Sequence, residues 1–292
     1  MKNSKRKLNG LYLGFFLILL LFEAVVVGRT MTMATVQPVM SVVNLTQMDL
    51  NSEIIVEAPI SYDLEGAVKQ LTIMQAKDHR YARIVNHRSD YPERLLINLA
   101  NNPELLSFVL EYPQDTGYQD DISLSTQELT DSCPLFLQWD IRWGYQAYGD
   151  NNIACSGCGP TALSMVIVGL THNAKATPAQ VAQFAAGKDY YEKGIGTKWE
   201  LMDAGPAAYG LTSETIAADE AGMKQQLDAG KFLIASMKAG DFTTGGHFIV
   251  ICGYNDRGFK IRDPFCIYRT GQTWDFATLN GQLEGLWAIG KS

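Results

Sequence analysis

A cysteine between two glycines is the clearest candidate for a reactive side chain in this sequence. Cys158 lies in the run SGCGPT (residues 156–161), and the apolar segment that follows predicts a buried helix beginning at the cysteine. Gly157 and Gly159 let another segment approach closely, and Pro160 suits a first helical turn. The partial positive charge of a helix N-terminus favours thiolate over thiol. Cys158 is therefore a candidate nucleophile at neutral pH.

Two further residues supply a possible base and a group to orient it. His247 follows two glycines and begins an apolar segment, 247–254, that predicts a strand. Asp263 follows a second predicted strand, 259–262, and the residues NDRG (255–258) between the strands predict a hairpin turn. Neighbouring antiparallel strands would bring His247 and Asp263 close together. A cysteine, a histidine and a carboxylate in such an arrangement are typical of nucleophilic catalysis.

The same residues also allow simpler interpretations. Cys155 and Cys158 form a C-x-x-C pattern, as in thiol redox enzymes, although no apolar β-α-β pattern precedes it. Cys158 could be an inert core thiol, His247 a structural histidine, and Asp263 a turn residue. Asp256 is a rival orienting carboxylate, but its place in the hairpin turn predicts exposure to solvent. The combination of all three residues favours catalysis.

Composition narrows the class of protein. The chain has 292 residues, of which 47% are hydrophobic and 19% charged, which suits one well-packed domain plus a smaller one. The net charge of -7 argues against a nucleic-acid partner. The histidines do not pair with one another, with cysteines or with carboxylates at metal-ligand spacing, so we expect no metal and no cofactor. The histidines are His79, His87, His172 and His247.

The N-terminus indicates export. Four basic residues among the first seven precede an apolar stretch from Leu11 to Phe22. This pattern predicts a signal peptide or signal-anchor over residues 1–29. The length of the apolar stretch fits either a signal peptide that is cleaved or a segment that stays in the membrane as a single span. We therefore expect the rest of the chain outside the cytoplasm, secreted or held at the cell membrane.

An odd number of cysteines outside the cell indicates at least one free thiol. If Cys158 is that thiol, the other four either pair or stay reduced, and Cys155 is a candidate partner for Cys133. The five are Cys133, Cys155, Cys158, Cys252 and Cys266.

The order of predicted elements indicates an α+β fold. Residues 30–113 contain a helical region, with helices predicted over 62–74 and 80–86, from Tyr91, and from Asn102 to Tyr112. We expect this region to be a spacer or docking element and not a catalytic unit. A polar and acidic linker, 114–131, leads to a C-terminal domain over 132–292. Helices are predicted there over 158–169, 177–184, 198–209 and 219–229, and strands over 232–237, 247–254, 259–262 and 286–289.

Several motifs of this domain together resemble the C39-like branch of the papain-type cysteine peptidases. They are QWD (138–140), Trp143, Tyr148-Gly149, SGCGPT (156–161), GHF (246–248) and Asp263-Pro264. The resemblance covers roughly residues 133–292. It implies a papain-like fold, with a cysteine-bearing helix packed on an antiparallel sheet that carries the histidine and the aspartate. It also implies roles for four residues: Cys158 as nucleophile, His247 as base, Asp263 to orient the imidazole and Gln138 to donate to the oxyanion. The alternative for Gln138 is a buried amide that supports a loop.

The reaction implied by this resemblance is peptide-bond hydrolysis through an acyl-enzyme thioester. The expected partner is a peptide or protein substrate outside the cytoplasm: a secreted peptide, a surface protein or a cell-wall cross-link peptide. Two other functions remain open. One is a non-catalytic peptide-binding module with the same fold, and the other is a transferase in which an amine replaces water.

Overall fold

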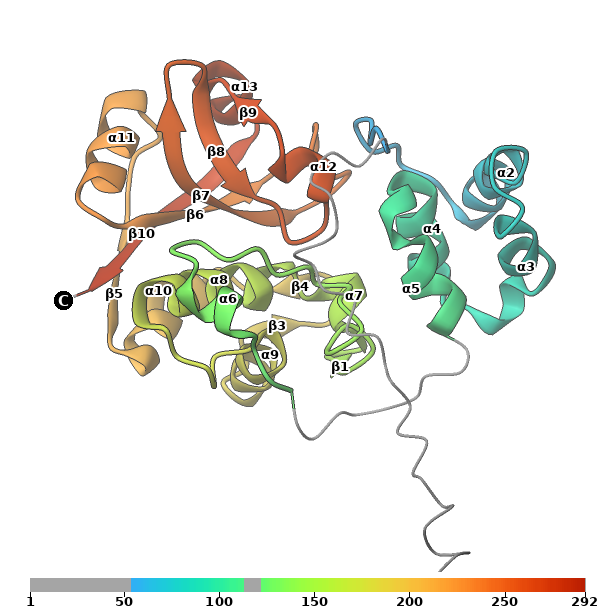
Figure 1. Cartoon of the computed structure of the whole chain (residues 1–292), viewed down its shortest axis with the longest axis horizontal. Coiled ribbons are helices and arrows are strands. Elements are labelled where there is room, and N and C mark those ends of the chain that lie inside the picture. The colour runs from blue at the N-terminus through green and yellow to red at the C-terminus, as the bar shows by residue number, and fades with distance from the viewer. Residues whose placement is uncertain (1–53, 113–121, 292) are drawn as a thin grey trace, which may run out of the picture. The chain divides into compact units, whose positions relative to one another are not determined.

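The computed structural model describes residues 54–112 and 122–291 (Figure 1). All described residues belong to one compact unit, Leu50–Ser292. The predicted signal segment, residues 1–29, lies outside the described residues. Within the two described ranges, no helix has the length and hydropathy needed to cross a bilayer.

Residues 64–112 are mostly helical, as their periodicity predicted. The first helix begins after Asp63, whose carboxylate accepts a hydrogen bond from the N–H of Gly66 at 2.7 Å. Asn102 caps a later turn through the N–H of Glu104 at 3.1 Å, and a proline occupies the first position of that turn. The elements are α2 (Leu64–Met74), α3 (Tyr81–Asn86), η2 (Arg88–Asp90), α4 (Glu93–Asn101), η3 (Pro103–Leu105) and α5 (Leu106–Glu111). Their buried core includes Leu71, Ile84, Leu95, Leu96, Leu99 and Leu105.

The end of the segment predicted as a linker, 114–131, is helical. Helix α6 (Thr126–Thr130) begins at a capping box formed by Ser125 and Glu128. The Glu128 carboxylate also pairs with Arg142 at 2.6 Å, which ties α6 to the C-terminal domain. The helix was not predicted because it is only one turn long and lies in a polar and acidic segment without an apolar period.

Helix α8 (Cys158–Thr171) lies at the centre of the C-terminal domain. Most of its side chains are buried, because apolar and small residues occur on nearly all of its sides. It ends at His172, whose φ of 56° is left-handed. The elements that accompany it are β1 (Ala147–Tyr148), β2 (Asn151–Asn152), α7 (Ile153–Ser156), α9 (Pro178–Gly187), β3 (Tyr191–Glu192) and β4 (Gly196–Thr197).

The helix predicted over 198–209 is divided. It consists of α10 (Glu200–Ala204) and a 3-10 helix, η5 (Gly205–Tyr209). Pro206 lacks the N–H that an α-helix requires at this position, so the chain continues in the tighter form.

A six-stranded antiparallel sheet forms the second half of the domain, in the order β5-β10-β6-β7-β8-β9. The four predicted strands are present as β6, β7, β8 and β10. The sequence analysis missed β5, which is mostly polar and exposed, and β9, which has two residues. The strands are β5 (Leu211–Thr215), β6 (Phe232–Met237), β7 (His247–Asn255), β8 (Gly258–Arg262), β9 (Thr273–Trp274) and β10 (Leu283–Lys291).

Helices cover both faces of this sheet (Figure 1). Along β6, Ile234 packs into a core shared with α8 and α9, whereas Leu233 and Ala235 pack into a second core. The second core lies under α11 (Glu220–Asp228) and α13 (Phe276–Asn280). This division follows from the opposite directions of consecutive strand side chains. The α+β class is thus confirmed, and α8 packs against the strand that begins with His247.

Candidate active site

Cys158 occupies the first position of α8, as the glycines and Pro160 around it predicted. Glycine is required on both sides of Cys158 because Ile153 and Thr197 occupy the space that larger side chains would need. A Cβ atom on Gly157 would lie 2.5 Å from the side chain of Ile153, and one on Gly159 would lie 2.7 Å from Thr197. Any larger residue beside Cys158 would therefore displace a neighbouring element. The turn between α7 and α8 is tightly packed and fixes the backbone of the cysteine.

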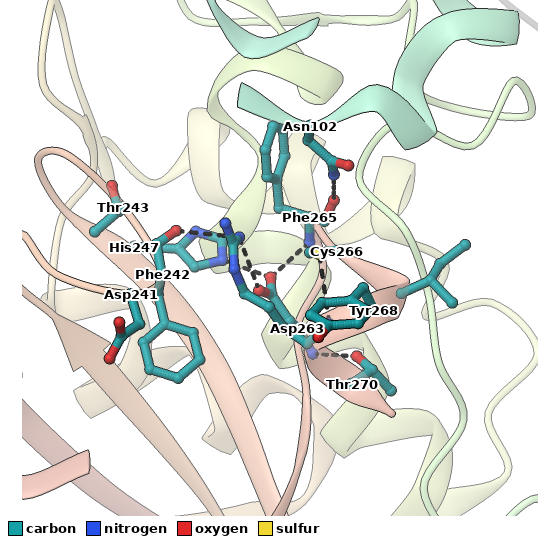
Figure 2. Close-up of polar contacts among 12 residues, drawn as sticks. Asn102, Asp241, Phe242, Thr243, His247, Asp263, Phe265, Cys266, Tyr268 and Thr270 are labelled. Atoms are coloured by element: carbon teal, nitrogen blue, oxygen red, sulfur yellow. Dashed lines mark hydrogen bonds and ion pairs between the residues drawn. The ribbon is translucent and has the colours of Figure 1, made fainter. Parts of the chain in front are cut away.

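His247 and Asp263 lie beside each other at the ends of neighbouring strands (Figure 2). Val250 of β7 pairs with Arg262 of β8, so Asp263 directly follows β8 and faces the start of β7. Nε2 of His247 lies 2.7 Å from Oδ1 of Asp263. The side chains are 7% and 0% exposed, so solvent barely screens this interaction. The imidazole of His247 also interacts with the Cys158 thiol and lowers the pKa of that thiol.

Asp263 is fixed from several directions (Figure 2). Its Oδ1 also accepts from the N–H of Phe265 at 2.8 Å, and its own N–H donates to Oγ1 of Thr270 at 2.9 Å. Its Oδ2 lies 3.5 Å from Nη1 of Arg269, a guanidinium that is itself 3% exposed. These contacts allow one orientation of the carboxylate, with Oδ1 toward His247.

The electrostatics of the site favour a charged pair. Burial opposes ionisation of Cys158, but the hydrogen bond and positive charge of His247 outweigh it and lower the pKa of the thiol. Burial likewise opposes the imidazolium, but the charge and hydrogen bond of Asp263, with those of Cys158, raise the pKa of His247 to about 9. The pKa of the Asp263 carboxyl is lowered, because His247 and Arg269 outweigh its burial. The arrangement thus favours a thiolate and an imidazolium with a carboxylate behind them.

Gln138 lies between the two segments that carry these residues. Its backbone N–H donates to the carbonyl of Pro264 at 2.7 Å, just after Asp263. Its side-chain Nε2 donates to the carbonyl of Ala154 at 2.7 Å, in the helix just before Cys158. A primary amide has two donor hydrogens, and the contact with Ala154 uses one of them. The side chain is 3% exposed.

Substitution of Gln138 by alanine tests its role as an oxyanion donor. We expect kcat for peptide hydrolysis to fall on the order of 10²–10³-fold, the cost of one lost oxyanion donor. Alkylation of Cys158 by iodoacetamide forms no oxyanion and should keep its wild-type rate. Equal losses in both reactions would instead assign Gln138 a purely structural role.

Sequence reasoning missed the residues that hold Asp263 in place. Arg269 and Thr270 follow it by six and seven residues and lack any local motif that would pair them with it. Trp139 was noted only as part of the QWD motif, yet its Nε1 donates to the carbonyl of Phe265 at 2.8 Å. These contacts depend on the path of the chain after β8, which the sequence pattern did not specify.

All five cysteines are free thiols, and the suggested pairing of Cys155 with Cys133 is not present. Cys133 interacts with Cys252 instead. This interaction and the charge of Arg262 lower the pKa of Cys252 to about 7. Cys155 is buried, which raises the pKa of its thiol to about 12, so it is a poor redox partner for Cys158.

Asp256, the rival orienting carboxylate, is exposed in the turn between β7 and β8. Among residues 54–112 and 122–291, no group of three or more histidine, cysteine or carboxylate side chains is arranged to hold a metal ion.

A family model described as the Peptidase_C39 like family matches residues 130–289 of this sequence. The chain belongs to the peptidase C39-like family. No curated protein matches it. Among solved structures, a crystal structure assigned as a C39-like peptidase from Bacillus anthracis covers 59% of this chain and 99% of its own length, with 12% identity and a TM-score of 0.33.

Proposed function

We propose that this chain is an exported or membrane-anchored cysteine peptidase that hydrolyses peptide bonds through Cys158. The observation that carries the proposal is the 2.7 Å contact of His247 with Asp263, together with the interaction of the same imidazole with Cys158 that lowers the pKa of the thiol. A nucleophile, a base and a group that orients the base are the parts that acyl transfer requires. Membership of the C39-like family supports the same reaction, and a papain-like arrangement of the helix and the sheet would present these parts to a substrate.

The first half of the proposed reaction forms a thioester. The Cys158 thiolate attacks the carbonyl carbon of the substrate, and the carbonyl π electrons move to oxygen. The oxyanion accepts hydrogen bonds from the Gln138 amide and from the N–H of Cys158, which has no intrahelical acceptor at the start of α8. When the tetrahedral intermediate collapses, the C–N bond breaks. The His247 imidazolium then gives its proton to the leaving amine.

Water completes the cycle. Neutral His247 takes a proton from water while the oxygen attacks the thioester carbon, and collapse of this second intermediate breaks the C–S bond. The products are a free carboxylic acid, the Cys158 thiolate and the His247 imidazolium. Asp263 stays ionised throughout and keeps the imidazole in one orientation.

The proposed substrate is a peptide or protein outside the cytoplasm, including a cell-wall cross-link peptide. Support for export comes from the basic residues and apolar stretch of residues 1–29. Cell fractionation of the full chain, followed by protease treatment of intact cells, tests this placement. Recovery of the chain only in the cytoplasm would contradict it.

Product analysis tests the reaction. The full-length chain in detergent would be incubated with a peptide library in water enriched in ¹⁸O. We expect new carboxyl termini that carry the label, and no products from Cys158→Ala. A product whose mass includes an added amine would establish the transferase, whereas peptide binding without turnover would establish the binding module.

A further inference from the structure

We infer that the helical region, residues 54–112, is part of the catalytic unit, because Glu104 and Asn102 hold the loop that carries Asp263. This loop, residues 263–268, is called the Asp263 loop below. The inference rests on the proposed function, since it concerns how the base of that reaction is oriented. It assigns Glu104 and Asn102 as positioning residues, which act through the loop without touching substrate.

Glu104 binds the far end of the loop. Its Oε2 accepts from the N–H of Ile267 at 2.7 Å, and its Oε1 accepts from the N–H of Tyr268 at 2.8 Å. Ile267 begins the short helix α12 (Ile267–Thr270), and the N–H groups at a helix start have no intrahelical acceptor. One buried carboxylate, 8% exposed, thus satisfies two backbone donors of the C-terminal domain.

Asn102 binds the middle of the loop (Figure 2). Its Nδ2 donates to the carbonyl of Phe265 at 2.7 Å, while its Oδ1 accepts from the N–H of Glu104 at 3.1 Å. The Phe265 carbonyl also accepts from Trp139. The N–H of Phe265 is one of the two donors to Oδ1 of Asp263. A displaced Phe265 would therefore move the carboxylate that orients His247.

Arg269 forms a second link to the helical region. Its Nη1 lies 3.5 Å from Oδ2 of Asp263, and its Nη2 donates to the backbone carbonyl of Glu57 at 3.3 Å. The same guanidinium donates to the carbonyl of Phe242 at 3.4 Å. The polar contacts around Asp263 thus continue directly into the first described residues of the chain.

The helical region also contacts the cysteine side of the site. The rings of Phe108 and Tyr145 stack at 4.2 Å, and Tyr145 donates its hydroxyl hydrogen to the carbonyl of Phe108 at 2.8 Å. Helix α4 contacts α7, the turn that precedes Cys158. The region therefore holds both the segment before the nucleophile and the loop after the orienting carboxylate, which is unlike a spacer.

The test uses two variants of the full chain, Glu104→Gln and Asn102→Ser. Glutamine keeps the size of Glu104 but presents only one acceptor oxygen to the two N–H groups. Serine keeps the capping acceptor of Asn102 but lacks the donor for Phe265. The matched control is Glu111→Gln, an exposed carboxylate at the end of α5 in the same region.

The readouts are the pKa of His247, from NMR titration of ¹⁵N-labelled histidine, and kcat for hydrolysis. We expect both variants to lower the pKa of His247 from about 9 toward its ordinary value of 6.5. We expect kcat to fall on the order of tenfold to a hundredfold, the scale of a misplaced catalytic group. The Glu111→Gln control should change neither quantity.

An unchanged His247 titration in folded Glu104→Gln would overturn the inference. If Glu104→Gln does not fold, Asn102→Ser decides the matter by the same titration. This test is independent of the proposed function, because the titration of His247 needs no substrate. If the two variants lower the pKa of His247 as expected but the wild-type chain hydrolyses no peptide, the proposed function is wrong and the positioning role of Glu104 and Asn102 stands.

Discussion

Replacement of His247 by alanine will lower kcat/KM for peptide hydrolysis by about 10⁴-fold or more, the scale seen when a member of a catalytic triad is removed. The charge and hydrogen bond of the imidazole lower the pKa of Cys158, and in the proposed reaction the imidazolium also gives its proton to the leaving amine. Without the imidazole, burial raises the pKa of the Cys158 thiol, which then stays neutral. Alkylation at mildly acidic pH should slow for the same reason.

The matched control for this variant is His79→Ala, because His79 is exposed in the helical region. It should leave hydrolysis and alkylation unchanged. Hydrolysis by His247→Ala at a rate near that of the wild type would show that another group acts as the base.

Replacement of Asp263 by asparagine will lower kcat by on the order of 10³–10⁴-fold and narrow the pH range of activity. Against the effect of burial, the charge and hydrogen bond of Asp263, with those of Cys158, raise the pKa of His247 from 6.5 to about 9. The imidazolium that the proposed proton transfer needs therefore persists in the wild type until the pH approaches that value. Loss of the charge lowers this pKa. The alkaline limit of kcat/KM should therefore move down, toward neutral pH, with a smaller change at the acidic limit set by Cys158.

Asp256→Asn is the control, because Asp256 is the exposed aspartate in the turn after β7. It should leave the pH profile unchanged. A drop in kcat for Asp263→Asn without movement of the alkaline limit would contradict an electrostatic role for Asp263 and indicate a structural one.

The elements around the site were predictable where their signals are local. The flanking glycines and the apolar run predicted a helix from Cys158, and the hairpin residues predicted the neighbouring strands that carry His247 and Asp263. Each of these patterns arises within about ten residues of chain, where backbone preference and hydrophobic period act directly. The role of Gln138 was different, since only the resemblance to a family suggested it.

The support of the site could not be predicted, because it depends on contacts between distant segments. A helix was predicted from Asn102, and Asn102 caps the turn that begins there, yet its amide also reaches Phe265, 163 residues later. Glu104 lies in the same turn, and its carboxylate binds backbone of the C-terminal domain. Sequence periodicity reports which face of a helix is apolar but not which loop a buried polar residue will meet.

Alkylation of Cys158 as a function of pH tests the central claim most directly. The full chain in a Cys252→Ser background would be treated with limiting iodoacetamide, and its intact mass recorded. The background removes Cys252, whose pKa of about 7 would otherwise compete. We expect one fast adduct at about pH 6, where an ordinary thiol is almost unreactive. This adduct should be absent in Cys158→Ala and should form more slowly in His247→Ala. Slow labelling spread over several cysteines and indifferent to His247 would contradict an activated nucleophile.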